Sequence, residues 1–346
     1  MTGASFLRPM SRCMSLCLLL CLGACGEDPE LPPAQALTTD PQLLQQLYGA
    51  QTGPLGVVSA RGLQLDERDG ERALEFNLYY PDTGTGYPLL LFSHGNWSNK
   101  DSYDAVIEHW VSHGYAVIAP DHLDCCGAVS GILNSLRYGQ LGLIEGRVHD
   151  MQRLLARLPE IEKLQPAFAG KSDPARLGLA GHSFGAFTAQ QFGGAAALDP
   201  DTEKYQTYLD ERVGAIVALS PPGPMFDTIT AESWLQLSTP TLVTTGTWDI
   251  QPTFWPDWQM HLMSFETAVA GDKYALVTQG ADHYMGNLIC RLEREETPQD
   301  DALLMVRIVS TAFLDAYLKN DATARAFIDS DQLTELTEGF TVLSRR

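Results

Sequence analysis

The chain has 346 residues, of which 45% are hydrophobic and 19% are charged, so it can bury the core of one large domain. Its formal net charge of -20 argues against binding to nucleic acid and against electrostatic docking on an anionic membrane, because both surfaces would repel it. The acidity favours solubility and says little about the fold.

The first 24 residues have the pattern of a signal peptide, in which two arginines precede a short apolar run at 14–22 and small residues follow. That run is shorter than a typical membrane-spanning helix. The sequence Leu22-Gly23-Ala24-Cys25 resembles the lipobox of bacterial lipoproteins, in which the cysteine is acylated after cleavage on its amino side. The resemblance implies an exported lipoprotein that is anchored through Cys25, at the outer membrane or periplasmic face of a Gram-negative cell. Ordinary cleavage nearby, with Cys25 a bystander, is the alternative.

The segment after Cys25, GEDPELPPAQAL, is acidic and proline-rich, which is typical of a flexible tether. We therefore expect the lipidated cysteine and its tether over residues 25–47. No internal repeat or linker interrupts the remaining chain, so a single domain is expected over residues 48–346.

Strand and helix patterns alternate through this domain. Segments 62–67 and 74–81 flank Asp69-Gly70, a turn pattern, and predict an antiparallel pair. Further strands are predicted at 87–95, 115–122, 176–183, 213–223, 239–249 and 273–283, and helices at 102–114, 145–158, 301–320 and from residue 184 onward. Near-continuous apolar strands separated by helices predict an α/β fold with a mostly parallel central sheet covered on both faces. Ligands of such sheets bind at the carboxyl ends of the strands.

The sequence RLGLAGHSFGAFTAQQF, residues 176–192, places the pattern Gly-x-Ser-x-Gly between a predicted buried strand and a predicted helix. Gly181 and Gly185 suit this pattern because the turn is too tight for side chains at those positions. The turn would lift Ser183 above the sheet at a helix amino terminus, whose partial positive charge favours an oxyanion. The context predicts that Ser183 is a nucleophile and not merely a turn serine.

A serine hydroxyl needs a base, and after such a turn the partners follow in the order serine, acid, histidine, each behind a later strand. Asp249 ends one predicted strand and His283 ends the next. We therefore expect a triad of Ser183, Asp249 and His283.

Other acids and histidines fit these roles less well. Asp257 falls past the strand end, and Asp282 adjoins His283 itself. His261 follows no predicted strand. The other rejected histidines lie in predicted helices or inside the serine turn: His109, His113, His149 and His182.

An oxyanion hole needs two donors that point to one place. We expect the backbone N–H of Phe184, which follows the nucleophile, and that of Asn96, in the loop after the strand that ends in SHG. His94 in this loop either supports it by hydrogen bonds or is a plain buried histidine.

These motifs resemble those of serine α/β-hydrolases, in the group of dienelactone-hydrolase-like proteins and platelet-activating-factor acetylhydrolases. The matching segments, within about residues 50–320, are LLLFSHGNW, WVSHGYAVIAPDH, RVHDMQRLLARL, DPARLGLAGHSFGAFTA, GTWD and GADHYMG. The resemblance implies the α/β-hydrolase fold, hydrolysis of carboxylic esters by the same triad, and no cofactor. Two positions depart from the group, because dienelactone hydrolases have cysteine in place of Ser183, and Ala186 replaces a common third glycine.

Aromatic residues suggest where the substrate lies. Trp97 follows the oxyanion loop and Trp248 precedes the acid, so both could wall an apolar pocket, although each is as well explained as core. Only a short stretch separates VALSPPG from STPTLV, which argues against a large cap domain. The expected cleft is therefore open to bulky or surface-presented esters.

Cysteine usage in an exported chain predicts one disulfide, of Cys290 with Cys125 or Cys126, in preference to a strained vicinal bridge. No metal site is predicted, because DCCG lacks the second ligand pair of a zinc site. Arg147 and Asp150 stand at helical spacing and suggest an ion pair.

The sequence thus predicts a carboxylic ester hydrolase that works through an acyl-enzyme on a small-molecule or lipid ester, with no nucleic-acid partner. Within enzymes, the alternatives are a lipid or phospholipid esterase like the platelet-activating-factor acetylhydrolases, a polyester hydrolase and, less favoured, a serine peptidase. The alternative from another class is a non-catalytic binding protein on the same scaffold.

Overall fold

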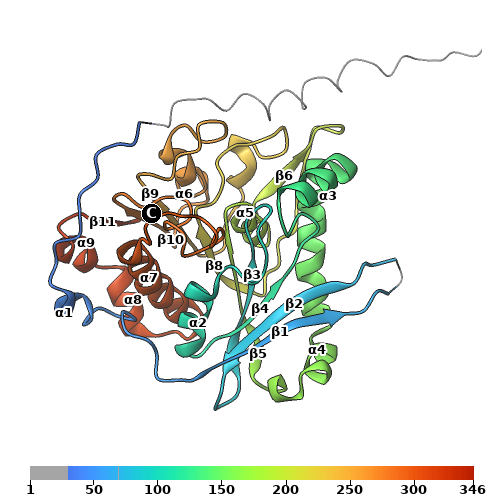
Figure 1. Cartoon of the computed structure of the whole chain (residues 1–346), viewed down its shortest axis with the longest axis horizontal. Coiled ribbons are helices and arrows are strands. Elements are labelled where there is room, and N and C mark those ends of the chain that lie inside the picture. Colours follow the sequence, from blue (N-terminus) through green and yellow to red (C-terminus); the bar gives the residue numbers. More distant parts are fainter. Residues whose placement is uncertain (1–29, 69) are drawn as a thin grey trace, which may run out of the picture. The chain divides into compact units, whose positions relative to one another are not determined.

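The computed structural model describes residues 30–68 and 70–346. Their main sheet has nine strands in the order β1-β2-β4-β3-β5-β8-β9-β10-β11 (Figure 1). The strands are β1 (Val57–Leu65), β2 (Leu74–Pro81), β3 (Tyr87–Ser93), β4 (Ala116–Pro120), β5 (Ser172–His182), β8 (Val213–Leu219), β9 (Thr241–Gly246), β10 (Lys273–Thr278) and β11 (Thr341–Arg345). Six neighbouring strands, β4, β3, β5, β8, β9 and β10, run parallel to one another. The strands β1, β2 and β11 pair antiparallel with their neighbours. The predicted mostly parallel sheet is confirmed.

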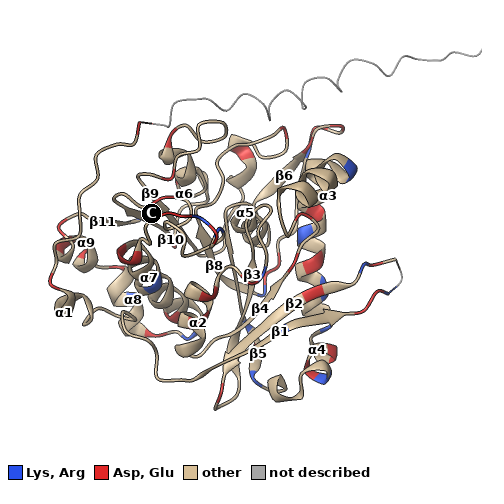
Figure 2. Ribbon diagram, viewed as in Figure 1, with Lys and Arg blue, Asp and Glu red and all other residues tan. Residues whose placement is uncertain are grey.

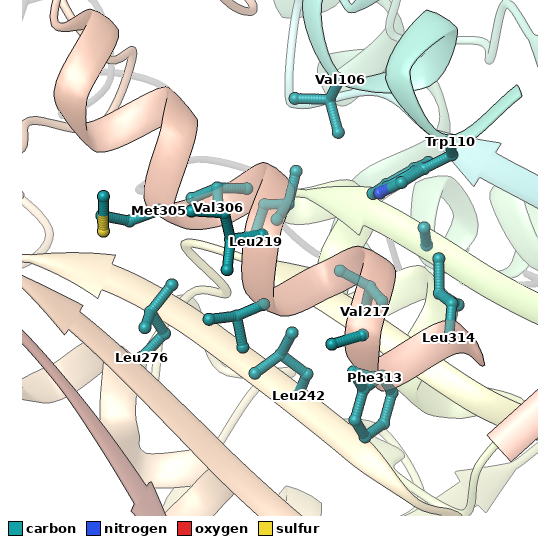
Figure 3. Packing of buried hydrophobic residues seen from close by; sticks show 14 of the residues in the cluster. Val106, Trp110, Val217, Leu219, Leu242, Leu276, Met305, Val306, Phe313 and Leu314 are labelled. Carbon is teal, nitrogen blue, oxygen red and sulfur yellow. The ribbon is translucent and has the colours of Figure 1, made fainter. Parts of the chain in front are cut away.

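Helices cover both faces of the sheet. They are α1 (Pro41–Leu44), α2 (Asp104–Ser112), α3 (Ala128–Ala156), α4 (Leu158–Leu164), α5 (Phe184–Gln191), α6 (Met263–Thr267), α7 (Asp300–Leu318), α8 (Ala322–Ile328) and α9 (Gln332–Leu336). One core packs α2, α7 and α8 against the sheet, and the other packs α3, α4 and α5. The helix α7 lies across β8, β9 and β10, with Val306 and Phe313 facing the sheet residues Val217, Leu242 and Leu276 (Figure 3).

Alternation along the strands supplies both cores. In β3, Leu90 and Phe92 join the α2–α7 core, while Leu89 and Leu91 join the α3–α5 core. All four side chains are fully buried, which explains why this strand reads as a continuous apolar run and not as an alternating one.

The helix α3 is longer than the sequence predicted and has two parts. The predicted helix at 145–158 corresponds to its second part, and the chain is already helical from Ala128. Gly139, with φ 70° and ψ 172°, breaks the helical backbone between the two parts. The first part was missed because its apolar residues do not face a core: Val129, Leu133 and Leu136 are 76%, 61% and 71% exposed.

The folded unit begins earlier than expected. It starts at Leu31, so much of the segment predicted as a tether over 25–47 packs on the domain instead of leading to a boundary at 48. Leu44 and Leu47 are buried in the core, and Thr39 Oγ1 donates to the Leu336 carbonyl at 2.8 Å. The burial of these apolar side chains therefore holds the segment on the domain in spite of its proline-rich composition. The expected signal peptide and the expected acylation of Cys25 lie outside the described residues. No helix in the part of the chain that the structure describes is long and apolar enough to cross a membrane.

The cysteine pairing predicted from the sequence is wrong. Cys125 and Cys126 form a vicinal disulfide with each other, and Cys290 is a free, buried cysteine. Ser98 lies between these two groups, because its carbonyl accepts from Cys126 N at 2.9 Å and its hydroxyl donates to the Cys290 carbonyl at 3.0 Å. Burial raises the pKa of the Cys290 thiol, which is shut into the interior near Tyr103.

Candidate active site

The turn at Ser183 has the geometry that its glycines imply. Ser183 lies between β5 and α5 with φ 54°, a left-handed conformation that is rare for a residue with a side chain. A Cβ at Gly181 would overlap the Gly185 carbonyl, and one at Gly185 would overlap the Ser93 carbonyl. Ser183 N donates to the Leu219 carbonyl of β8 at 2.8 Å. The turn is therefore clamped between two neighbouring strands, at the carboxyl edge of the sheet.

Asp249 and His283 come together after β9 and β10, which lie two and three strands along the sheet from β5. His283 Nδ1 donates to Asp249 Oδ1 at 2.7 Å, and Thr245 Oγ1 donates to Asp249 Oδ2 at 3.0 Å. Burial alone would raise the pKa of the Asp249 carboxyl, but the facing His261 and His283 hold that pKa well below its ordinary value. Asp249 is thus an ionised, fully buried carboxylate, and it leaves Nε2 as the nitrogen of His283 that can accept a proton.

The serine turn and the histidine loop are joined by His182, which precedes the nucleophile. His182 Nε2 donates to the His283 carbonyl at 2.9 Å, and Tyr103 OH lies 3.1 Å from His182 Nδ1. Tyr103 OH also accepts from Gly95 N at 2.8 Å. Complete burial and the neighbouring His283 hold the pKa of His182 well below its ordinary value. A neutral His182 therefore links the turn at Ser183, the loop that contains His283 and, through Tyr103, the loop after β3.

The loop after β3 is held by a second buried network. His94 Nδ1 donates to the Gly95 carbonyl at 2.7 Å, and His94 Nε2 accepts from His122 N at 3.0 Å. Burial and the nearby Arg147 lower the pKa of His94 to about 3, so it stays neutral in this tautomer. Of the two interpretations of His94, the structure favours the one in which its hydrogen bonds support the loop.

The ion pair predicted between Arg147 and Asp150 is wrong. It does not pair with Asp150, since Arg147 Nη2 lies 2.6 Å from Asp124 Oδ2, and Asp150 Oδ2 lies 2.6 Å from Arg72 Nη2. Arg147 Nη1 donates to the His94 carbonyl at 2.6 Å, and its guanidinium lies 4.8 Å from the centre of the Phe184 ring. Helical spacing suggested a pair within the helix, but both side chains point to different partners on the sheet side.

Both expected oxyanion donors have free N–H groups. Among the described residues, no acceptor takes a hydrogen bond from the backbone N–H of Asn96 or of Phe184. Phe184 is the first residue of α5, where helix N–H groups lack intrahelical partners. Arg291 donates to the carbonyls of Asn96 and Trp97 at 3.3 Å, so the carbonyl side of the loop is fixed while the N–H of Asn96 stays available.

A cavity of about 520 Å³ lies beside His283. Trp248 lines it, and the Trp248 Nε1 donates to the Pro32 carbonyl at 2.7 Å. Trp97 is placed differently, because its ring packs against Gly131 of α3 and it does not line this cavity. A third aromatic, Trp255, stacks on His283 with ring centres 5.7 Å apart.

Two groups of described side chains present ligand atoms close enough together to hold a metal ion. The first is Asp249, His261 and His283, whose atoms already face one another as hydrogen-bond and ion partners. The second is Asp121 with Cys125 and Cys126, whose sulfur atoms are bonded to each other. Neither arrangement needs an ion to explain it.

The sequence analysis did not predict that His261 lies next to Asp249. This histidine lies in the short 3-10 segment η3 (Trp258–Leu262), behind no strand, and no motif marks it. Its Nε2 nevertheless lies 3.0 Å from Asp249 Oδ1. Its position depends on how the loop between β9 and β10 folds back over the acid, which local sequence patterns do not determine.

The fold and this site define the class of the protein. A family model described as the alpha/beta hydrolase family matches residues 90–333, and the chain belongs to that family. It has the α/β-hydrolase fold, as the resemblance of its motifs implied.

The chain also resembles one known enzyme over part of its length. The chain is similar to a platelet-activating factor acetylhydrolase from Cavia porcellus, with 27% identity over 156 residues. The match covers 34% of this chain and 36% of that relative, so the chain spans about a third of the relative's length.

Proposed function

We propose that this protein is a serine hydrolase that cleaves carboxylic esters through an acyl-enzyme. The observation that carries the proposal is the placement of Ser183 on a strained strand–helix turn, at the same edge of the sheet as the pair in which His283 donates to Asp249 at 2.7 Å. The match to the hydrolase family and to an acetylhydrolase supports the same reaction class.

In the proposed reaction, Ser183 Oγ attacks the ester carbonyl while His283 Nε2 takes its proton. Asp249 holds the His283 tautomer and stabilises the imidazolium that forms. The N–H groups of Phe184 and Asn96 bind the oxyanion. His283 then returns the proton to the leaving alcohol, and water hydrolyses the acyl-enzyme by the same steps in reverse roles.

A fluorophosphonate probe tests this class of mechanism, since it labels an activated serine and not an ordinary one. We expect the folded protein to be labelled on Ser183 and heat-denatured protein to remain unlabelled. Ser220→Ala is a matched control, because Ser220 is also 6% exposed and also has a positive φ, of 44°. Loss of labelling in Ser183→Ala but not in Ser220→Ala supports the proposal. An unlabelled wild type would favour a non-catalytic binding protein.

The first part of α3 favours lipid esters presented at a surface as substrates. Its exposed apolar residues recur at helical spacing, and Arg137 is its one charged residue, so this part of the ribbon is almost free of charge (Figure 2). The helix begins beside the oxyanion loop, because Gly127 N donates to the Trp97 carbonyl at 3.0 Å. An apolar stripe next to the site suits contact with a neutral lipid surface.

The expected acylation of Cys25 agrees with this placement and is part of the same proposal. The described chain starts next to His283, since Leu31 lines the same cavity as this histidine. A lipid anchor at Cys25 would then hold the site within about 20 Å of the membrane, at the length of an extended residue. Export to the envelope of a Gram-negative cell is proposed with it.

Replacing two exposed leucines tests the surface role. The double variant Leu133→Ser/Leu136→Ser should hydrolyse an ester carried in neutral phosphatidylcholine vesicles about 10-fold more slowly, because two side chains lose apolar burial in lipid. Its rate on a soluble p-nitrophenyl ester should not change. The control is Leu164→Ser/Leu235→Ser, which removes leucines that are 44% and 51% exposed elsewhere. Equal loss in both doubles, or no loss in the first, would exclude α3 as the lipid-contacting surface.

A further inference from the structure

A second histidine contacts the acid of the proposed triad. His261 is fully buried, and its Nε2 lies 3.0 Å from Asp249 Oδ1, the same oxygen that accepts from His283. These two atoms are close, but their geometry is not that of a well-aligned hydrogen bond. On the other side of the ring, Nδ1 of His261 lies 2.6 Å from the Pro221 carbonyl, in the loop after β8.

The protons of His261 follow from what each neighbour can do. The Pro221 carbonyl only accepts hydrogen bonds, so Nδ1 of His261 carries a proton. The Asp249 carboxylate also only accepts, and an unprotonated Nε2 at 3.0 Å would set a lone pair against an anionic oxygen. A second proton, on Nε2, would avoid this contact and would make the ring an imidazolium cation.

The surroundings of His261 contain one anion and further histidines. The charged and titratable groups that face it are Asp249 after β9, His283 after β10 and, beyond His283, His182 at the end of β5. Burial alone would lower the pKa of His261, but the Asp249 carboxylate and the Pro221 carbonyl raise it above the ordinary value. Trp255 covers the site, with its ring centre 5.0 Å from that of His261.

We propose that His261 is a positioning residue of the hydrolase, a buried imidazolium that fixes Asp249 and extends the action of His283 as a base to lower pH. The inference rests on the proposed function and deepens it. His261 does not itself line the cavity beside His283, so it acts through Asp249 and His283.

A positive charge on His261 affects the protonation of His283 in a definite direction. A fixed cation with its ring centre 5.7 Å from that of His283 opposes a second positive charge there, and it also shares the negative charge of Asp249. Loss of the charge on His261 would remove both effects. Removing the cation should therefore move the acid limb of the kcat/KM profile to higher pH, by about two pH units at an effective dielectric constant of about 20.

The pH dependence of stability has its own sign. Because the pKa of His261 is raised on folding, its protonation stabilises the fold fully below the ordinary value of about 6.5. This contribution is lost as the pH rises through the higher pKa of the folded state. The stability difference between wild type and an uncharged variant should thus be largest in mildly acid solution.

Two variants separate the charge from the contact. His261→Gln has a longer amide that can still donate to Asp249 without charge, whereas His261→Asn can reach only the Pro221 side. We expect both to shift the acid limb to higher pH, measured as kcat/KM against pH on a soluble p-nitrophenyl ester. We also expect kcat at the optimum to fall about 10-fold in His261→Asn and less in His261→Gln, because a small displacement of a catalytic group is costly. A merely structural histidine would change stability without moving the pH profile.

Nitrogen NMR of protein with isotope-labelled histidine shows how many ring nitrogens of His261 carry a proton. This measurement does not depend on enzyme activity. The wild type should show one imidazole with both nitrogens protonated at pH 7.5, and this signal should be missing in His261→Gln. An acid limb that stays in place in both folded variants, or a singly protonated His261, would overturn the inference while leaving the proposed ester hydrolysis standing. A wild type without esterase activity or fluorophosphonate labelling would instead overturn the proposed function.

Discussion

Replacing Ser183 by alanine is expected to lower kcat for short p-nitrophenyl esters by at least about 10⁴-fold, because the nucleophile is removed and only binding and oxyanion stabilisation remain. The loss should be in kcat and not in KM, since the hydroxyl acts in bond formation. Steady-state kinetics with acetate and butyrate esters measure the effect.

The fold should survive this replacement. Alanine adopts the φ of 54° at position 183 with the same strain as serine, and the Ser183 N–H bond to Leu219 does not involve the side chain. We expect the free energy of unfolding in urea to change by less than about 1 kcal/mol. Ser220→Ala, at the end of β8, should retain wild-type kcat. If Ser183→Ala hydrolyses the esters as fast as Ser220→Ala, the proposed nucleophile is wrong.

The parts of the site that follow strand ends could be predicted from the sequence. Parallel strands have their carboxyl ends at one edge of the sheet, so recognising buried strands before Ser183, Asp249 and His283 was enough to place these residues at that edge. The two glycines around Ser183 carried similar information, because a tight turn leaves few residue types possible at those positions.

Residues held by long-range packing could not be predicted in the same way. Arg147 and His261 reach the site from a helix and from a loop, and their partners are 23 and 12 residues away along the chain. Nothing in the local pattern distinguishes such side chains from surface ones, and the helical spacing of Arg147 and Asp150 even suggested a false pair.

The errors near the amino terminus and at the cysteines have a common cause. Composition favoured a free tether over residues 31–47, yet Leu44 and Leu47 find places in the core that only the folded sheet and α7 create. Export chemistry favoured pairing Cys290 with a distant cysteine, yet Ser98 separates it from Cys125 and Cys126. In both cases the missing information was the position of segments distant in sequence.

Replacing Asp249 by asparagine is expected to lower kcat by about 10⁴-fold, as at triads in which the acid holds the histidine tautomer. Asp249 Oδ1 accepts from His283 and contacts His261, and Oδ2 accepts from Thr245. An amide can offer only one acceptor oxygen to these donors. Where its NH₂ group faces His283, the ring must carry its proton on Nε2, which is the atom that has to receive the proton of Ser183.

The rival acid Asp257 supplies the matched control for this substitution. Its carboxylate accepts from Gln259 N at 3.1 Å at the start of η3 and lies exposed at the surface. Asp257→Asn should therefore change kcat less than about 3-fold, because an asparagine cap keeps most of this interaction. The same esters and pH range serve both variants. A large loss in Asp257→Asn together with a small loss in Asp249→Asn would transfer the role of the acid, and with it the proposed effect of His261, away from Asp249.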